Sequence, residues 1–529
     1  MARVLLIDDD ETQLDIRRLI VERVGHAVAV AADIASARRQ FQQFQPDLVV
    51  MDVRIPGVDD GLALIRELSA SERRPRMLVL CGWPADLEGR PEADSVDQVF
   101  TKPVRTQRVL DWMARFAVLL IALGVSLHAA TFRVLHRAEM IANLEIASPG
   151  SDWSRPGCEA ALADVRIDGT VSQQVMLYAG AEPHEYPVFL GEQAPGEHTI
   201  SIERNNQFSA PGSQVRLRSI GVRPAPQTEE DIVANAPVLF ARRNTVGKFT
   251  DVPMIVYAER LSDSGKPILQ YTVIFSNEDG GTSTRALMAR WGRTTDVEYV
   301  YRAWLNPSGQ VERASIQADG HKEVEFKGRR DGSHPLLIPI TDNNMISDGE
   351  PSAIRYQIAP VLADLTGHSR EEVIDDHPFA YRVMSEELLR EDKLRPFGTV
   401  DGQKISDPRN YIYLEAKVEN RGSGFVALAR LKNENRWRES NLGREDYAIE
   451  RSGSVRTTIE LPPGTKESDV AELGFGCVVV RPNLSGSCRV DAVSKVFFLS
   501  RSYVPNPSFW RESQSVEVPA GQIVSFPMP

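Results

Sequence analysis

Short apolar runs alternate with amphipathic stretches over the first hundred residues. Two of these stretches, 12–24 and 34–44, repeat apolar residues at helical spacing, which predicts helices with one buried face. Strands that alternate with helices are typical of a parallel sheet covered by helices. The apolar runs predict strands near residues 3–7, 27–31, 47–52, 77–81 and 97–101.

Charged residues stand at the ends of three of these strands. Asp8 and Asp9 follow the first strand, Asp52 ends the third, and Lys102 follows the fifth. Because the carboxyl ends of parallel strands meet at one crevice, these side chains should converge. Carboxylates packed so closely are costly unless a cation joins them. The pattern therefore predicts a Mg²⁺ site that shares its ion with a phosphate, and a carboxylate that can become an aspartyl-phosphate.

Three segments carry a family resemblance. They read VLLIDDDE at 4–11, PDLVVMDVRIPG at 46–57 and TKPV at 101–104. In this order and spacing they closely resemble the receiver domain of bacterial response regulators, over residues 1–113. The resemblance implies a flavodoxin-like, doubly wound α/β domain.

The resemblance also assigns roles to individual residues. It implies that Asp52 accepts a phosphoryl group from a sensor histidine kinase or a phosphotransfer protein. Lys102 would pair with that group. The cofactor would be Mg²⁺, held by Asp8, Asp9, Asp52 and the backbone carbonyl of Arg54. The alternative from the residues alone is an α/β domain whose acidic strand ends bind nothing.

Several positions depart from the receiver pattern. Receivers usually place Thr or Ser where this chain has Cys81, and a thiol is a weak hydrogen-bond donor. The aromatic residue expected three positions before Lys102 is Val99, with Phe100 displaced by one position. Pro84 and Pro91 are poor helix formers where the fourth helix belongs. These departures predict a receiver that is phosphorylated but switches weakly, or that acts as a phosphate sink.

A strongly apolar segment comes after the receiver-like part. Residues 116–132, read as FAVLLIALGVSLHAATF, lie between Arg115 and Arg133. We expect a transmembrane or signal-anchor helix over 114–133, which is at the short limit for a bilayer span. The basic residues before it favour a cytoplasmic receiver and an extracytoplasmic C-terminal part. A secretory signal cleaved near Ala129 and a buried core helix are the alternatives.

The pattern changes from about residue 145 onward. Short β-branched or alternating runs separated by Gly, Pro, Asn and Asp replace the helical spacing, which predicts an all-β, sandwich-type region. We expect a jelly-roll-like sandwich over 145–225 and one or more β-rich domains over 235–529. Residues 370–395 read as a helical insertion. The turn at 194–198 resembles edge hairpins of carbohydrate-binding modules, so a carbohydrate is a candidate ligand.

Two features of the β-rich part are candidates for chemistry. Cys477 and Cys488 flank a turn between apolar runs, and in an exported protein they could form a disulfide. Acidic residues, an aromatic ring and a histidine gather in a second stretch. Oxygen ligands on loops suit Ca²⁺, and the tryptophan could stack on a sugar, but Asn, Asp and Gly are also ordinary turn residues. The members of this stretch are Glu278, Asp279, Trp291, Asp296, Glu298, His321 and Asp342.

Charge limits the function classes. The formal net charge is −12 and the pI is near 5.4, so we expect no nucleic-acid partner. The leading interpretation is phosphorelay signalling through a receiver joined by a membrane segment to an extracytoplasmic β-rich region. In the alternative, the second half acts apart from a stand-alone receiver, as an exported carbohydrate- or ligand-binding protein or an enzyme. The β-rich part carries no Gly-x-Ser-x-Gly, HExxH or P-loop motif.

Overall fold

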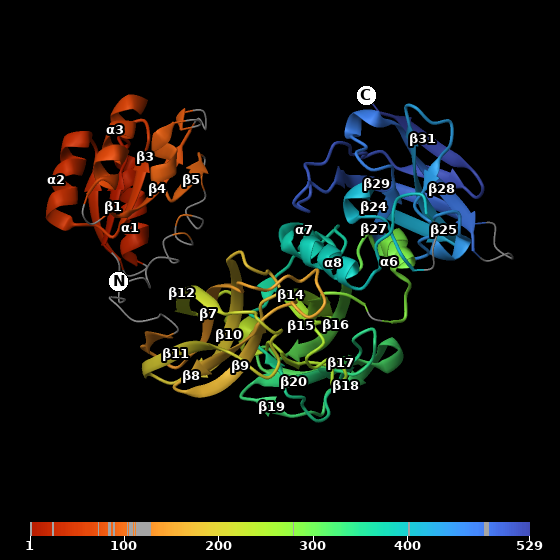
Figure 1. Cartoon of the computed structure of the whole chain (residues 1–529), viewed down its shortest axis with the longest axis horizontal. Helices are drawn as coiled ribbons and strands as arrows, with labels where there is room; N and C mark the ends of the chain where they lie inside the picture. Colours follow the sequence, from red (N-terminus) through yellow and green to blue (C-terminus); the bar gives the residue numbers. More distant parts are fainter. Residues whose placement is uncertain are drawn as a thin grey trace. The chain divides into compact units, whose positions relative to one another are not determined.

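The computed structural model divides the chain into two compact units, Met1–Val125 and Ser126–Pro529. It describes residues 3–23, 26–71, 74–82, 86–87, 90–102, 104, 109, 112, 129–278, 280–399, 403–480 and 486–528. Figure 1 traces both units.

A five-stranded parallel sheet with strand order β2-β1-β3-β4-β5 forms the first unit. This is the order of flavodoxin-like doubly wound folds, so the predicted architecture of this unit is confirmed. Its strands are β1 (Arg3–Ile7), β2 (Ala27–Ala31), β3 (Leu48–Asp52), β4 (Arg76–Cys81) and β5 (Gln98–Thr101).

Helices cover both faces of this sheet, α1 (Glu11–Arg23), α2 (Ile34–Phe44) and α3 (Val58–Ser69). Alternate residues of β1 supply the two cores: Leu5 and Ile7 lie in one cluster, and Val4 and Leu6 in the other. This division follows from the period of two along a strand. Asp33 caps α2 by accepting a hydrogen bond from the Ser36 backbone N–H.

Between β4 and β5 the structure has a short 3₁₀ helix, Pro91–Ser95 (η2). A 3₁₀ turn in place of an α-helix over these five residues agrees with the prediction that this stretch forms an α-helix poorly. After β5, Val109 and Trp112 are helical and buried against the sheet.

The predicted membrane segment is wrong at its C-terminal end. Ala129 to Phe132 belong to the strand β6 (Ala129–Val134), which pairs antiparallel with β11 (Gly196–Arg204). Phe132 is buried, so this end belongs to the packed core of a β sandwich. The remaining predicted residues, 114–128, lie outside the described part of the chain. Among the described helices, none is long and apolar enough to cross a membrane.

The second unit begins with a two-sheet sandwich. Its sheets have the antiparallel orders β10-β7-β12 and β6-β11-β8-β9. The sandwich starts at Ala129 rather than near residue 145, because β6 completes the edge of one sheet. Its remaining strands are β7 (Ala138–Ala147), β8 (Leu162–Ile167), β9 (Thr170–Met176), β10 (His184–Gln193) and β12 (Arg216–Pro224).

A middle part comes next, built on a six-stranded sheet with the order β18-β17-β16-β15-β14-β23. A smaller sheet has the order β19-β20-β13-β22, with β21 paired to β20. The helical elements of this part are α5 (Glu230–Ala234), α6 (Thr284–Trp291) and η3 (Asp319–His321). The strands are β13 (Val238–Phe240), β14 (Pro253–Asp263), β15 (Lys266–Phe275), β16 (Asp296–Leu305), β17 (Val311–Ala318), β18 (Lys322–Glu325), β19 (Arg330–Asp331), β20 (His334–Pro339), β21 (Ile346–Ser347), β22 (Arg355–Tyr356) and β23 (Val361–Leu362).

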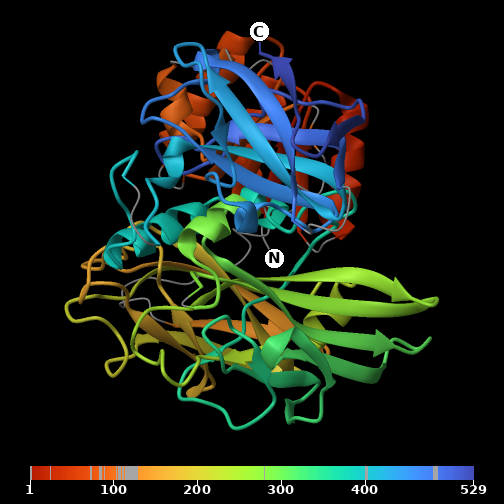
Figure 2. The ribbon, with the colours of Figure 1, turned by 90° about the vertical axis from the view of Figure 1, so that its right-hand side faces the viewer.

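The predicted helical insertion is present as α7 (Glu372–Asp376) and α8 (Phe379–Arg390). Both views show α6, α7 and α8 between the middle strands and the last sandwich (Figures 1 and 2). Two hydroxyls of the last sandwich stabilise the junction: Thr457 donates to the Ala289 carbonyl and Thr458 to that of Met288.

The last sandwich has the sheet orders β27-β24-β29-β30 and β26-β25-β28-β31 around a core of its own. Its short helical turns are η4 (Pro408–Asn410), η5 (Glu445–Tyr447) and η6 (Glu467–Asp469). Its strands are β24 (Tyr411–Arg421), β25 (Ser423–Leu431), β26 (Arg438–Glu439), β27 (Gly453–Glu460), β28 (Val470–Val479), β29 (Ser487–Phe498), β30 (Val516–Pro519) and β31 (Ile523–Pro527). The expectation of a β-rich C-terminal region is confirmed.

Candidate functional site

Strand ends of the first unit bring the predicted charged residues together. Lys102 Nζ lies 2.7 Å from Asp52 Oδ2 and 3.3 Å from Asp8 Oδ2. Arg17, on α1, donates to the same Asp8 oxygen from 2.6 Å. Asp8 follows β1, Asp52 ends β3, and Lys102 follows β5, so three strands and one helix build the site. Arg17 was not predicted; its position nine residues after Asp8, on the polar face of a helix, gives little signal in the sequence.

Charge compensation sets the protonation of this site. Burial alone would raise the pKa of Asp8, but the hydrogen bonds from Arg17 and the Asp10 backbone, with the charge of Lys102, hold that pKa below its usual value. Burial opposes the charge of Lys102, yet the hydrogen bond to Asp52 and the charge of Asp8 keep the pKa of Lys102 raised. Asp8 and Lys102 are therefore both charged at neutral pH.

The carboxylates fit a divalent cation. One oxygen from each of Asp8, Asp9 and Asp52 lies within 4.8 Å of the others. Asp8 is buried, Asp9 is exposed and Asp52 lies between these extremes, so the set opens toward solvent. Three carboxylate oxygens at an open edge suit Mg²⁺, which keeps several waters and is usually shared with phosphate.

Arg54 has two contacts in this site. Its backbone N–H donates to Asp52 Oδ1 over 2.9 Å, which holds the carboxylate in place. Its guanidinium forms a two-point pair with Asp86, at 2.7 and 2.9 Å. The role of its carbonyl as a cation ligand stays a prediction.

Cys81 ends β4 and is fully buried in the core cluster that also holds Met51 and Val79. A buried thiol replaces the hydroxyl that receivers usually offer there. On β5, Phe100 is buried in the other core cluster, while Val99 is 37 % exposed. The displaced aromatic side chain thus contributes to packing on the α1 side of the sheet.

The acidic cluster predicted in the β-rich part is partly assembled. Asp296 and Glu298 stand two residues apart on β16, and Glu278 comes shortly after the end of the neighbouring strand β15. His321 Nδ1 lies 3.9 Å from Glu298 Oε2. Asp279 lies outside the described residues.

Two predicted members of this cluster have other partners. Asp342 pairs with the buried guanidinium of Arg242. The ring of Trp291 lies under the guanidinium groups of Arg290, at 4.7 Å, and Arg451, at 5.2 Å. A sugar-stacking role for Trp291 stays a prediction, and the structure places arginines against this ring.

Cys477 and Cys488 are free thiols in the structure, and a disulfide between them stays a prediction. They lie on β28 and β29, which belong to opposite sheets of the last sandwich, and they meet across the core rather than within a hairpin. The hydrogen bond with Cys488 lowers the pKa of Cys477 to about 7.

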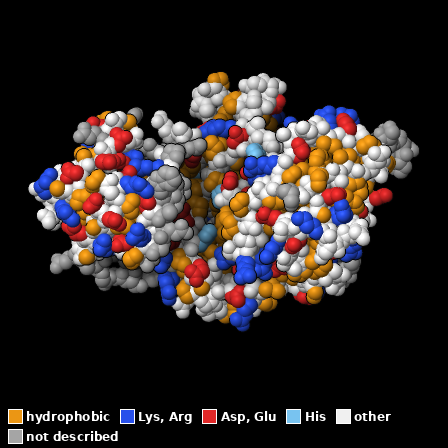
Figure 3. Space-filling model, turned by 90° about the horizontal axis from the view of Figure 1, so that it is seen from above, with side chains coloured by type: hydrophobic (Ala, Val, Ile, Leu, Met, Phe, Trp, Pro, Cys, Tyr) orange, Lys and Arg blue, Asp and Glu red, His pale blue; other side chains and the backbone are white. Residues whose placement is uncertain are grey.

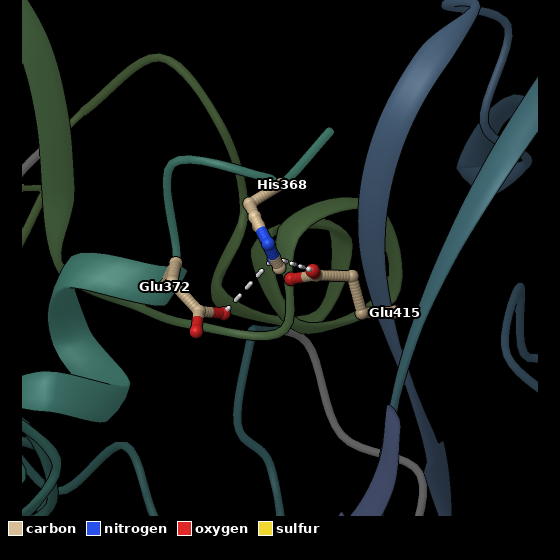
Figure 4. Close-up of side chains that lie close together, drawn as sticks. All are labelled: His368, Glu372 and Glu415. Carbon is tan, nitrogen blue, oxygen red and sulfur yellow. Dashed lines mark ion pairs between the residues drawn. The ribbon is translucent and has the colours of Figure 1, made fainter. Parts of the chain in front are cut away.

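The structure contains a further cluster, His368, Glu372 and Glu415, that no sequence motif predicts. His368 Nδ1 lies 3.4 Å from Glu415 Oε1 and 3.7 Å from Glu372 Oε2 (Figure 4). Lys495 pairs with Glu372, and the fully buried Arg456 pairs with Glu415 at 2.8 Å. These two cations already neutralise the carboxylates, so the cluster acts as an ion-pair network between α7 and the last sandwich. His368 and Glu372 stand four residues apart, whereas Glu415, Arg456 and Lys495 come from β24, β27 and β29. A local pattern in the sequence could therefore reveal only one pair of this cluster.

Comparisons with known proteins agree with the first site. The family of response regulator receiver domains matches residues 4–113. The transcriptional regulatory protein AfsQ1 of Streptomyces coelicolor is 33 % identical over 226 residues, which are 42 % of this chain and 95 % of that protein. The virulence transcriptional regulatory protein PhoP of Salmonella typhimurium is 30 % identical over 123 residues, 23 % of this chain and 52 % of PhoP, so the chain spans about half of that relative.

Among solved structures, a signal receiver domain from Bermanella marisrubri is similar at 26 % identity, over 22 % of this chain and 97 % of that one, with a TM-score of 0.20. The family match ends at residue 113, before the first β sandwich. The likeness to AfsQ1 and the family match agree with the pairing of Asp52 and Lys102 at the sheet edge: the chain belongs to the response regulators, through a receiver domain at its N-terminus.

Proposed function

We propose that this protein works in a two-component phosphorelay and accepts a phosphoryl group on Asp52 from a sensor histidine kinase or a phosphotransfer protein. One observation carries the proposal: the Lys102 ammonium lies 2.7 Å from an oxygen of Asp52 at the carboxyl edge of the sheet. A cation in that position can stabilise the negative charge that builds on the transferred group.

The chain's own residues supply position and charge. The Arg54 backbone N–H and Lys102 hold the Asp52 carboxylate, so that one oxygen faces the incoming phosphorus atom. As the new oxygen–phosphorus bond forms, the phosphorus–nitrogen bond of the donor histidine breaks and its imidazole leaves with the electron pair. Asp8, Asp9 and Asp52 would hold Mg²⁺, which would neutralise charge on the phosphoryl oxygens.

The buried thiol of Cys81 limits the conformational response to phosphorylation. A thiol donates a weaker hydrogen bond than a hydroxyl, so the phosphoryl group gains less from drawing this strand end toward itself. We therefore infer a receiver that is phosphorylated but switches weakly, or that acts as a phosphate sink.

Labelling with acetyl phosphate tests the phosphoacceptor. The full chain, incubated with radiolabelled acetyl phosphate and Mg²⁺, should gain acid-stable, base-labile label, and Asp52→Asn should lose it. Asp15→Asn, which removes an exposed carboxylate of α1, is the matched control and should label like the wild type. An unlabelled wild type, or equal label on Asp52→Asn, contradicts the proposal.

We further propose that the apolar residues before β6 direct the second unit across a membrane and leave the receiver in the cytoplasm. Residues 116–128, ahead of β6, are within the length of a secretory apolar region and follow Arg115. Cleavage near Ala129 would release the second unit with most of β6 intact. This part of the chain would then act as the exported ligand-binding half, with a carbohydrate as the candidate ligand.

Fractionation of cells that express the chain with a tag at each end tests this export. One membrane-bound band with both tags supports an anchor, and two shorter products, a cytoplasmic receiver and an exported β-rich part, support cleavage. A single full-length band in the cytoplasmic fraction contradicts both forms of the proposal.

A further inference from the structure

Both oxygens of the Asp8 carboxylate already accept hydrogen bonds from this chain. The Asp10 backbone N–H donates to Asp8 Oδ1 over 3.1 Å. Asp8 Oδ2 accepts from two cationic groups, the Arg17 guanidinium at 2.6 Å and the Lys102 ammonium at 3.3 Å. Asp8 is only 1 % exposed, so a cation that arrives from solvent can reach this carboxylate only by replacing one of these donors.

Of the two cationic donors, Arg17 is the one that the site can release. Lys102 has a second partner, because its Nζ lies 2.7 Å from Asp52 Oδ2. Among the side chains that the structure describes, Arg17 forms an ion pair with Asp8 alone. Helical side chains lean toward the N-terminus of their helix, so Arg17 reaches back from the second turn of α1 to the sheet edge.

Charge balance gives a reason why Arg17 and a divalent cation exclude each other at this edge. The carboxylates of Asp8, Asp9 and Asp52 carry three negative charges, and Lys102 and Arg17 together carry two positive charges. A divalent cation in place of the guanidinium makes the site neutral, whereas both together would leave an excess positive charge. Like charges against one buried carboxylate repel each other more strongly than they would in water.

We propose that Arg17 is a positioning residue that competes with Mg²⁺ for Asp8 Oδ2 and so sets the affinity of the receiver for this ion. In the arrangement that the structure shows, the guanidinium holds this oxygen. The Arg17 side chain is 17 % exposed, so the released guanidinium can turn to solvent. The inference rests on the Mg²⁺ site of the proposed function, but it does not depend on phosphoryl transfer to Asp52.

Calorimetric titration of the full chain with Mg²⁺ at neutral pH, after removal of metal with a chelator, tests this competition. Arg17→Gln should bind Mg²⁺ about tenfold more tightly than the wild type, which corresponds to about 1.4 kcal/mol, on the scale of one hydrogen bond to a charged group. Arg17→Lys keeps the positive charge and should bind Mg²⁺ with an affinity closer to that of the wild type.

The unfolding temperature of the receiver separates competition from a merely structural ion pair. With chelator present, Arg17→Gln should unfold at a lower temperature than the wild type, because Asp8 has lost a partner. Added Mg²⁺ should raise the unfolding temperature of Arg17→Gln more than that of the wild type, because a ligand that binds more tightly stabilises the folded state more. A structural pair alone would give both proteins the same rise.

Two further variants locate the effect. Arg18→Gln removes the same charge from the next position of α1, where Arg18 pairs with the exposed Asp15 and Glu22, and it should bind Mg²⁺ like the wild type. Adding Asp9→Asn to Arg17→Gln should weaken binding, which would place the ion at the receiver's carboxylates.

Three results would overturn the proposal: equal or weaker Mg²⁺ binding by Arg17→Gln than by the wild type, no binding by either protein at millimolar Mg²⁺, or an equal gain in Arg18→Gln. Labelling of Asp52 is measured separately. A chain that follows the expected Mg²⁺ pattern but gains no label would therefore contradict the phosphorelay proposal and support the role of Arg17.

Discussion

Single residues show how differently the two candidate sites handle negative charge. Asp8 is buried but keeps its charge because Arg17 and Lys102 lie against it. Asp296 is also buried, and its two acidic neighbours raise its pKa further. Asp251, His321 and Asn344, in the same part of the chain, have positive φ between 51° and 57°. Asn, Asp and His adopt this left-handed conformation more readily than other non-glycine residues.

Arg17→Gln should make the receiver's stability less dependent on acid pH. The pKa of Asp8 is held below 3.8 in the folded state, so its stabilising contribution is fully present above pH 3.8 and is lost as pH falls through the folded value. The variant should therefore unfold at a lower temperature than the wild type at neutral pH. The difference between the two unfolding temperatures should narrow as the pH falls below about 3.8.

Scanning calorimetry from neutral to acid pH measures this difference in unfolding temperature between Arg17→Gln and the wild type. The control is Arg18→Gln, which removes only exposed pairs with Asp15 and Glu22 on the surface of α1. Exposed pairs of this kind contribute about 0–1 kcal/mol, so this variant should stay near the wild type at every pH. A gap that is constant with pH would contradict the assignment of Arg17 to Asp8.

Cys81→Thr should strengthen the response to phosphorylation. A threonine hydroxyl at the end of β4 offers the phosphoryl oxygen a better donor than the thiol does. We expect a larger difference in backbone hydrogen exchange between the unmodified chain and the chain with Mg²⁺ and beryllofluoride. Cys81→Ala, which offers no donor, is the control; equal responses in all three proteins would show that the switch is limited elsewhere.

The first turn of α3 shows how neighbouring residues determine an element of the receiver. Asp59 and Asp60 stand in the first turn of α3, where they interact favourably with the helix dipole. The same turn contains Gly61, whose added Cβ would lie 1.9 Å from the Val53 carbonyl oxygen. The helix therefore packs on the chain leaving β3, and a glycine is what permits this approach.

Gly61→Ala should destabilise the receiver, although alanine is the better helix former. Intrinsic propensity would favour alanine by about 0.5–1 kcal/mol, whereas the clash with backbone forces α3 or the 53–57 loop to move. We expect a net loss of about 1–3 kcal/mol by denaturant unfolding of the receiver. At Gly57 the added Cβ would meet only the Asp60 carboxylate, at 3.1 Å, so Gly57→Ala is the matched control with a smaller effect.

Across the second unit, ion pairs and packed helices join parts that are distant in sequence. The network around Arg456 ties α7 to the last sandwich, with Asp375 at 2.7 Å and Glu415 at 2.8 Å. On the surface, acidic and basic side chains are interspersed over the face that Figure 3 draws. The expected absence of a nucleic-acid partner stays a prediction.

Arg456→Met should strongly destabilise the second unit. The change removes one partner of a buried network and leaves the Glu415 and Asp375 carboxylates short of a cation, at a cost of about 3–5 kcal/mol. Denaturant unfolding monitored by fluorescence measures the loss. Arg489→Met is the control, because this partly exposed residue pairs with Glu419 and Asp491 near the surface and should change stability by about 0–1 kcal/mol. Equal losses in the two variants would contradict a structural role for the buried network.

The sequence by itself determined the receiver. Periodicity along the chain predicts its strands and its first two helices. The carboxyl ends of parallel strands meet at one edge of the sheet, so the residues at those ends also predict that Asp8, Asp52 and Lys102 converge. Asp296 and Glu298 were predictable for a similar reason, because two acids at a spacing of two share one face of a strand.

Only the tertiary structure decided the fate of the C-terminal end of the apolar segment, the partners of Asp342 and Asn344, and the way in which Cys477 and Cys488 meet. An apolar run cannot tell a membrane helix from a strand, and pairing with β11 is what makes Ala129 to Phe132 part of β6. Asp342 pairs with Arg242, 100 residues away, and Asn344 contacts Asp296 instead, through contacts that follow no sequence period. Cys477 and Cys488 meet across two sheets because sandwich packing, rather than a turn, brings them together. Long-range contacts of this kind depend on how whole sheets stack, and a pattern along the chain does not encode that stacking directly.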